Sequence, residues 1–360
     1  MSEQSFRAGV IGLGWAGRQH MAAYAELPGV ELVALAGMER DQLSQLGDQY
    51  EVQHRYADWR DLVDDARLDV LSVATPTSLH GPIALAALGA KMHVLSEKPM
   101  AENATVARAM VQAAKDNDRV LEVSFNHRRR GGVRALKNVV DSGVLGRVYY
   151  AKTGWVRRQG IPGLGSWFTR ATTAGGGPLM DIGVHMLDMS LHVLGEPTGV
   201  AATAATYAEF GPRGRGGANT ELAAKTGASE GRFDVEDLAT AFLRLEDGGT
   251  LLLESSWAQW IPRDQCYVTL YGSDGGASLS WGGNPGSPQS LKVWTEVQGM
   301  PGQLKPPIGP SGGHTEAVMD FLTEVRSGDH AAYRGEEALT RAIIVDACYV
   351  SARDRCEVLI

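Results

Sequence analysis

The motif Gly-Leu-Gly-Trp-Ala-Gly at 12–17 constrains the fold most strongly, because it follows a short apolar run and opens a stretch with helical spacing. In a strand–turn–helix setting, Gly12 permits the tight turn, Gly14 lets the backbone approach a pyrophosphate, and Gly17 allows close packing of helix on strand. Amides at the helix N-terminus favour phosphate there. The motif therefore predicts dinucleotide binding. The predicted contacts are Gly12, Gly14, Trp15, Ala16 and Gly17.

The first 125 residues alternate short β-rich runs with Ala- and Leu-rich stretches of helical spacing. Strands are predicted at 8–11, 30–36, 69–74, 92–96 and 119–125, and helices at 15–27, 41–49, 83–88 and 104–115. Such alternation indicates βαβ units around a doubly wound parallel sheet, a Rossmann fold of the α/β class. Ligands of these sheets bind at the carboxyl ends of the strands.

After residue 125 longer strand-like runs are separated mainly by glycine-rich loops, which favours an α+β domain with an open, mostly antiparallel sheet. Strands are predicted at 147–158, 200–209, 238–245, 250–259 and 267–271, and helices at 131–142, 178–193, 315–325 and 337–352. Loops at 211–231, at 272–286 and around Pro301–Pro310 are interpreted as solvent loops or substrate lids. We expect two domains, 1–125 for dinucleotide binding and 126–360 for substrate binding and oligomerisation, with the last helices able to pack back on the first domain.

Charge and composition exclude several classes of function. A net charge of −8 and a pI near 5.6 disfavour a nucleic-acid or anionic-membrane surface. No apolar run approaches the roughly 20 residues that cross a bilayer. The chain shows no signal peptide, and its three cysteines form no C-x-x-C pair, so we expect a cytoplasmic protein without a structural zinc site.

The end of the second predicted strand bears on the choice between NAD and NADP. Gly37 stands where an aspartate would hold the ribose hydroxyls. Without that carboxylate, Arg40 could pair with the phosphate of NADP, whereas Glu39 could reach the ribose and favour NAD. The sequence is compatible with either NAD or NADP. It is also compatible with Glu39 and Arg40 being solvated turn residues that contact neither coenzyme.

Two further segments end predicted strands. One runs from Thr75-Pro76 to His80, and the other is Glu97-Lys98-Pro99. A lysine just past the carboxyl end of a strand points into the ligand crevice of such a sheet. There its cation can hydrogen-bond the nicotinamide ribose and a substrate hydroxyl, and it can stabilise a developing alkoxide.

A third segment follows three glycines at 175–177 and contains Asp181, His185, Asp188 and His192. At about 100° per residue these four side chains share one stripe of a helix. His185 could be oriented by Asp181 one turn earlier, and its imidazole can accept and return a hydroxyl proton near neutral pH. A metal site is the rival interpretation of the stripe. A structural role fits Asp188 and His192 better, since they lie deeper along the helix.

Taken together, these motifs resemble the glucose–fructose oxidoreductase / inositol dehydrogenase / rhizopine catabolism (Gfo/Idh/MocA) family over essentially the whole chain. The matching segments are G-x-G-x-x-G at 12–17, T-P-x-x-x-H at 75–80, E-K-P at 97–99, N-H-R at 126–128, S-G-V-L-G at 142–146 and D-x-G-x-H at 181–185. Gly37 departs from the dinucleotide pattern. In that family the second domain supports the active site and commonly forms the oligomer interface.

The resemblance implies an NAD(P)-dependent oxidoreductase acting on a secondary hydroxyl of a sugar, sugar derivative or inositol. Lys98 would position cofactor and substrate, Asp181 would bind or orient the substrate, and His185 would be the acid/base. The cofactor would be lined by Thr75, Pro76, His80, Glu97 and Asn126. Trp155, Arg157, Arg158 and Trp167 are candidate substrate contacts, with core or surface roles equally open. A homodimer or homotetramer through the C-terminal sheet is expected. An NAD-dependent glycosidase and a non-catalytic sensor of dinucleotide and sugar are the alternatives.

Overall fold

The computed structural model describes residues 5–65, 67–218, 233–283 and 286–360. The chain divides into two compact units. The first comprises Met1–Asn126 and Gly312–Ala342, and the second comprises His127–Ser311 and Ile343–Ile360. A segment near the end of the chain therefore belongs to the same unit as the N-terminal βαβ region.

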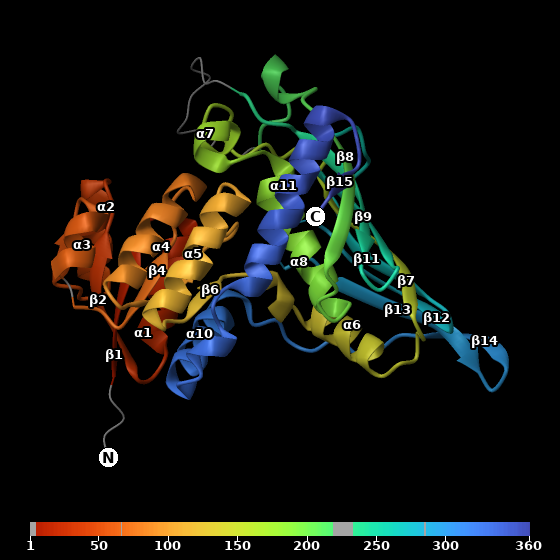
Figure 1. Cartoon of the computed structure of the whole chain (residues 1–360), viewed down its shortest axis with the longest axis horizontal. Coiled ribbons are helices and arrows are strands. Elements are labelled where there is room, and N and C mark those ends of the chain that lie inside the picture. Colours follow the sequence, from red (N-terminus) through yellow and green to blue (C-terminus); the bar gives the residue numbers. More distant parts are fainter. Residues whose placement is uncertain (1–4, 66, 219–232, 284–285) are drawn as a thin grey trace. The chain divides into compact units, whose positions relative to one another are not determined.

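The first unit contains a six-stranded sheet in the order β3-β2-β1-β4-β5-β6, and each neighbouring pair is parallel (Figure 1). The strands are β1 (Phe6–Ile11), β2 (Val30–Ala36), β3 (His54–Tyr56), β4 (Val70–Val73), β5 (His93–Ser96) and β6 (Leu121–Val123). The helices are α1 (Trp15–Glu26), α2 (Arg40–Gln49), α3 (Trp59–Asp65), α4 (His80–Gly89), α5 (Ala104–Asn117) and α10 (Gly313–Ser327). The prediction of a doubly wound parallel sheet is confirmed. The short elements β3 and α3 were not predicted.

Helix α10 completes the core of the first unit. Its buried residues Val318, Phe321, Leu322 and Val325 follow the i, i+3, i+4, i+7 spacing of one apolar helix face. This face packs in the same buried cluster as residues of α1 and β1. Closing the hydrophobic core of the βαβ region thus requires a helix that begins nearly 200 residues later in the chain.

The second unit contains a nine-stranded sheet in the order β14-β13-β12-β11-β7-β10-β9-β8-β15. Its strands are β7 (Val148–Val156), β8 (Gly199–Tyr207), β9 (Leu238–Leu245), β10 (Thr250–Ser256), β11 (Gln265–Gly272), β12 (Gly275–Trp281), β13 (Gln289–Val297), β14 (Met300–Leu304) and β15 (Val358–Leu359). All neighbouring pairs are antiparallel except β7 and β10. The prediction of a mostly antiparallel sheet is confirmed.

The interpretation of 272–286 as a loop is wrong. Residues 275–281 form β12, which pairs with β11 on one side and β13 on the other. Pro301, assigned to a third loop, lies in β14. Two neighbouring strands supply the pairing that the glycine-rich sequence does not indicate by itself. Residues 219–231 of the predicted loop at 211–231, together with residue 232 and residues 284–285, lie outside the described part of the chain.

Helices cover one face of the nine-stranded sheet. They include α6 (Gly131–Asp141), which packs on β12 and β13, and α8 (Val184–Val193), which packs on β7 (Figure 1). Helix α11 (Glu336–Asp354) meets β8, where the Ala204 amide donates to Ser351 Oγ at 2.9 Å. A short helix, α7 (Ala171–Ala174), precedes α8 in sequence. On β7 the side chains of Ala151, Thr153 and Trp155 are buried and, two residues apart, share the face packed by α8. Among the described residues, no helix is long and apolar enough to cross a membrane.

Candidate active site

The glycine turn between β1 and α1 has the local geometry of a phosphate cradle. A Cβ on Gly12, whose φ is +106°, would lie 2.2 Å from the carbonyl oxygen of Ala74, and a Cβ on Gly17 would lie 2.0 Å from that of Gly12. Both positions therefore require glycine. Gly14, the N-cap of α1, has no atom within 4 Å of its Cβ position. This open space at a helix N-terminus fits the pyrophosphate of a dinucleotide.

The loops that follow β4 and β5 are joined by His80. Its Nδ1 lies 2.8 Å from the carbonyl oxygen of Pro99 and its Nε2 lies 2.9 Å from that of Thr75. Burial lowers the pKa of this imidazole, which is only 1% exposed. His80 thus ties together the two segments that contain Pro76 and Lys98.

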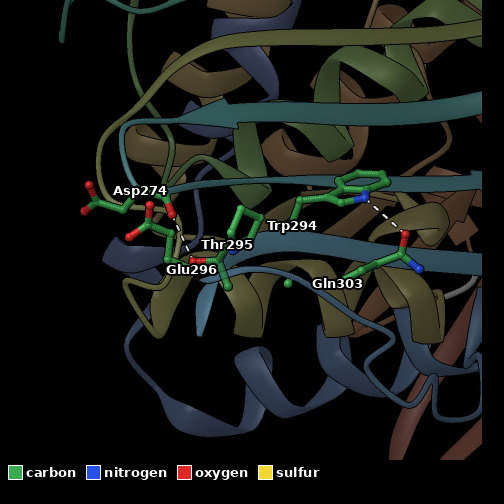
Figure 2. Close-up of a pocket in the computed structure, with 7 residues that line it drawn as sticks. Asp274, Trp294, Thr295, Glu296 and Gln303 are labelled. Carbon is green, nitrogen blue, oxygen red and sulfur yellow. Dashed lines mark hydrogen bonds between the residues drawn. The ribbon is translucent and has the colours of Figure 1, made fainter. Parts of the chain in front are cut away.

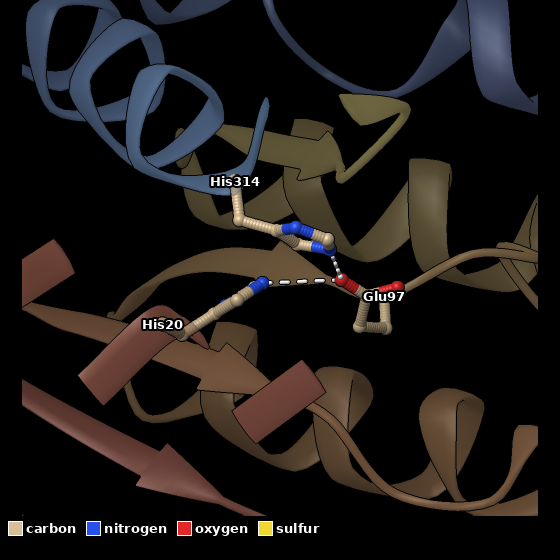
Figure 3. Close-up of side chains that lie close together, drawn as sticks. All are labelled: His20, Glu97 and His314. Carbon is tan, nitrogen blue, oxygen red and sulfur yellow. Dashed lines mark hydrogen bonds and ion pairs between the residues drawn. The ribbon is translucent and has the colours of Figure 1, made fainter. Parts of the chain in front are cut away.

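Glu97 lies between two histidines (Figure 3). Its Oε1 is 3.1 Å from Nε2 of His20 in α1 and 3.6 Å from Nε2 of His314 in α10, and its Oε2 accepts the Lys98 amide at 3.2 Å. Burial alone would raise the pKa of Glu97. The hydrogen bond and charge of His20, with the charges of His314 and Lys98, instead lower it to about 2. The residue before Lys98 is therefore a buried carboxylate.

These two histidines and Glu97 place three potential metal ligands within 4.8 Å of one another, and no other such group occurs among the described residues. The other ring nitrogen of His20 lies 2.9 Å from Ser72 Oγ, and Asn126 Nδ2 lies 3.2 Å from Nδ1 of His314. These contacts connect Asn126 and α10 to Glu97 through the two histidines.

Trp15 is 68% exposed, and its ring meets that of His314 edge to face with centroids 5.0 Å apart. On the next strand, a Cβ on Gly37 would lie 2.5 Å from Leu13 Cγ and 3.4 Å from Glu39 Oε2. Leu13 therefore explains why position 37 carries no side chain. The Glu39 carboxylate lies beside this strand end, and Arg40 is the exposed first residue of α2.

In the second unit, Asp181 lies in a π-helical turn, Leu179–Gly183, directly before α8. Spacing of 100° per residue assumes an α-helix, so the predicted stripe does not extend back through Asp181. Its Oδ2 accepts a hydrogen bond from Nε1 of Trp257 at 2.9 Å. Trp257, which follows β10, is completely buried, so it holds the carboxylate from a fixed position.

His185, the second residue of α8, is 6% exposed and belongs to an aromatic group. The His127 ring lies against it with centroids 4.3 Å apart, and the Trp155 ring lies 5.3 Å from His127. Nε of Arg130 donates to Nδ1 of His127 at 3.1 Å, and the Arg157 guanidinium lies 5.0 Å from the Trp155 ring. The unit thus brings together three predicted site residues, His185, Trp155 and Arg157.

The other residues of the predicted stripe have ionic partners. Asp188 is buried and accepts two hydrogen bonds from Nε of Arg128, at 2.8 and 3.0 Å, and one from its Nη2 at 2.6 Å. His192 faces Glu196 at 3.7 Å. Trp167 stacks on Phe168 with ring centroids 3.8 Å apart.

A cavity of about 460 Å³ lies at the β13–β14 hairpin (Figure 2). It is lined by Asp274, Trp294, Thr295, Glu296, Pro301, Gly302 and Gln303. Trp294 Nε1 donates to Gln303 Oε1 at 3.1 Å, and Thr295 Oγ1 donates to the Asp274 carbonyl oxygen at 2.9 Å. No predicted site residue lines it, and it offers no histidine, lysine or cysteine.

Several residues that complete these groups were not predicted from the sequence. His127 follows Asn126 in the N-H-R segment, whose sequence alone predicts no role for the histidine. Trp257 has no local signal beyond its place after a strand. His20 and His314 are nearly 300 residues apart in sequence, so their meeting at Glu97 becomes evident only in the fold.

Comparisons with known proteins agree with this architecture. Residues 6–125 match the model of the Gfo/Idh/MocA oxidoreductase family with its NAD-binding Rossmann fold. Residues 133–278 match the model of the Gfo/Idh/MocA C-terminal domain.

Two relatives and one solved structure illustrate the similarity. D-glucoside 3-dehydrogenase of Escherichia coli is 34% identical over 98% of this chain and 97% of its own length. Levoglucosan dehydrogenase of Pseudarthrobacter phenanthrenivorans is 30% identical over 70% of this chain and 68% of its own length. The crystal structure of aldose-aldose oxidoreductase from Caulobacter crescentus is 25% identical, covers 99% of this chain and 100% of that one, and superposes with a TM-score of 0.80. The chain therefore belongs to the Gfo/Idh/MocA oxidoreductase family and has its NAD-binding Rossmann fold.

Proposed function

We propose that this protein is a dehydrogenase that moves a hydride between a nicotinamide cofactor and a secondary hydroxyl or ketone of a sugar, sugar derivative or inositol. The observation that carries the proposal is His185, a buried imidazole held among aromatic rings in a chain that also has the NAD-binding fold of the family. The names of the relatives, which include a glucoside dehydrogenase, a levoglucosan dehydrogenase and inositol dehydrogenases, support this substrate class.

Each candidate residue has a chemical role in this reaction. The imidazole of His185 accepts the hydroxyl proton during oxidation and returns it during reduction. The ammonium group of Lys98 stabilises negative charge on the reacting oxygen. Asp181, fixed by Trp257, accepts a hydrogen bond from a substrate hydroxyl. The nicotinamide cofactor supplies the hydride acceptor, and the glycine turn at 12–17 would hold its pyrophosphate.

The direct test is nicotinamide absorbance across a panel of free sugars, inositols and glycosides, with NAD and NADP in parallel. We expect reduction of the cofactor with one substrate class. Release of free sugar without net reduction would favour the glycosidase. Cofactor binding with neither reaction would favour the sensor.

We further propose that Glu39 makes the enzyme prefer NAD over NADP. Its carboxylate lies beside the end of β2, where it can accept hydrogen bonds from the ribose hydroxyls and repel a 2′-phosphate. Hydrogen bonds to a charged group contribute about 1.5–3 kcal/mol, so the preference should be tenfold or more.

Fluorescence titration with NADH and NADPH checks this prediction. We expect Glu39→Gln to weaken NADH binding and to bring the dissociation constants for NADH and NADPH closer together. Glu31→Gln, which removes an exposed carboxylate near the opposite end of the same strand, is the control. Tighter binding of NADPH by the unaltered protein would show that Arg40 decides the preference instead.

We also infer that a second copy covers the sheet face turned away from the helices. The rings of Tyr150 and Tyr271 stack there at 5.3 Å, Lys152 lies over both, and the neighbouring Leu252 is exposed. Sedimentation velocity should show a dimer or tetramer, and Leu252→Glu should dissociate it, because an unpaired charge is costly at a buried interface. A monomeric wild type would contradict the inference.

A further inference from the structure

The three glycines at 175–177 precede the turn that contains Asp181, and two residues distant in sequence pack closely against them. A Cβ on Gly176 would lie 2.0 Å from the phenol oxygen of Tyr349, and a Cβ on Gly177 would lie 2.0 Å from the carbonyl oxygen of Glu236. The glycines at these two positions therefore permit close packing.

Glu236 is buried, and donors converge on its carboxylate. Oε2 accepts the Gly177 amide at 2.9 Å, while Oε1 accepts the Leu179 amide at 3.1 Å and the Tyr349 hydroxyl at 2.9 Å. These amides open the π-helical turn and would otherwise have no partner within the helix. Burial raises the pKa of Glu236, and the three hydrogen bonds oppose that shift.

The same segment of chain also supports Asp181 by a second route. The carbonyl oxygen of Asp237, the residue after Glu236, accepts the Trp257 amide at 3.0 Å. The Trp257 indole donates in turn to Asp181 Oδ2. In addition, the Asp181 amide donates to the Gly177 carbonyl at 3.0 Å. Both the backbone and the carboxylate of Asp181 are thus tied to residues 236 and 237.

We propose that Glu236, with Tyr349 hydrogen-bonded to it, is a positioning residue that clamps the start of the π-helical turn and thereby fixes Asp181 and the beginning of α8. π-Helical turns are rare and short, so this one needs contacts from outside the helix to persist. The role in catalysis rests on the proposed function, in which Asp181 meets the substrate. The clamp itself is independent of the proposed function, because it consists only of contacts within the second unit.

Two substitutions test the clamp. Glu236→Gln keeps the shape but replaces one acceptor oxygen with an NH₂ group that faces a backbone N–H or the phenol. Tyr349→Phe removes one of the three hydrogen bonds. Tyr56→Phe is the matched control, because it removes a phenol–carboxylate bond of the same 2.9 Å length, to Asp65 on the surface of the first unit.

Hydrogen–deuterium exchange of the peptide that spans 175–185 reports on the clamp without any substrate. We expect faster exchange there in Glu236→Gln, a smaller increase in Tyr349→Phe and none in Tyr56→Phe. Unchanged exchange in Glu236→Gln would overturn the clamp. A wild type that is inactive on every sugar would contradict the proposed function but would leave this exchange test of the clamp valid.

Steady-state kinetics then tests the positioning role. A misplacement of about 1 Å can lower turnover by about 10²-fold, so Glu236→Gln should lower kcat by up to that factor. The dissociation constant for NADH, measured by fluorescence, should not change, because the glycine turn is in the first unit. Faster exchange with wild-type kcat would overturn the positioning role.

Discussion

Replacement of His185 by alanine is expected to lower kcat by about 10²–10⁴-fold, the usual contribution of a general acid–base residue. Alanine cannot accept the hydroxyl proton during oxidation or supply it during reduction, so both directions should slow together. The dissociation constant for NADH should not change, because the glycine turn and the ends of β4 and β5 belong to the first unit. Steady-state rates and fluorescence titration measure the two quantities separately.

His192 provides the matched control within the same helix. It is half-buried about two turns further along α8 and faces Glu196 at 3.7 Å. His192→Ala should therefore turn over at close to the wild-type rate. If the two variants were equally impaired, the loss would reflect damage to α8, and if His185→Ala remained fully active, this histidine would have no part in the mechanism.

The first unit could be predicted well because its signals are local. The glycine motif and the alternation of strand-like and helical runs lie within short windows, and the observed parallel sheet follows them closely. The strand β3 escaped prediction because His54-Arg55-Tyr56 shows no apolar run. Its place in the sheet depends on pairing with β2, a contact that composition does not indicate.

The second unit was less predictable where contacts distant in sequence decide the local structure. Glycine-rich residues 275–281 form a strand because β11 and β13 pair with them on both sides. The turn at Leu179–Gly183 is π-helical, whereas the periodic pattern predicted a continuous α-helix. Its capping carboxylate, Glu236, comes from 57 residues beyond Leu179, so no local window contains the information.

The candidate site residues also fall into two groups, those that a local sequence pattern predicts and those that only the tertiary structure reveals. Lys98, Asp181 and His185 lie in short segments whose residue types predict the chemistry. The residues that surround them, such as His127, Trp257 and His314, could not be chosen, because each approaches its partner only through the fold. Motifs thus indicate which groups can react, and the tertiary structure shows how they are held.

Replacement of Lys98 by methionine should reduce kcat/KM by about 10²–10³-fold, as expected when a preorganised positive charge at a developing oxyanion is removed. Methionine keeps most of the side-chain length, so packing changes little while the charge and its hydrogen bonds are lost. The carboxylate of Glu97, whose pKa is about 2, remains in place without the ammonium group that follows it in the chain. Its negative charge should oppose alkoxide formation and deepen the defect.

Lys91→Met is the matched control, since Lys91 is an exposed lysine whose Nζ contacts Asn117 at 2.9 Å. It should retain the wild-type kcat/KM. Lys98→Arg separates charge from geometry, because guanidinium keeps the positive charge but presents it in a planar fork. Partial activity in Lys98→Arg, with almost none in Lys98→Met, would identify the charge as the main contribution. Wild-type kcat/KM in Lys98→Met would leave the proposed reaction without its oxygen-stabilising group and would assign this lysine to a structural role.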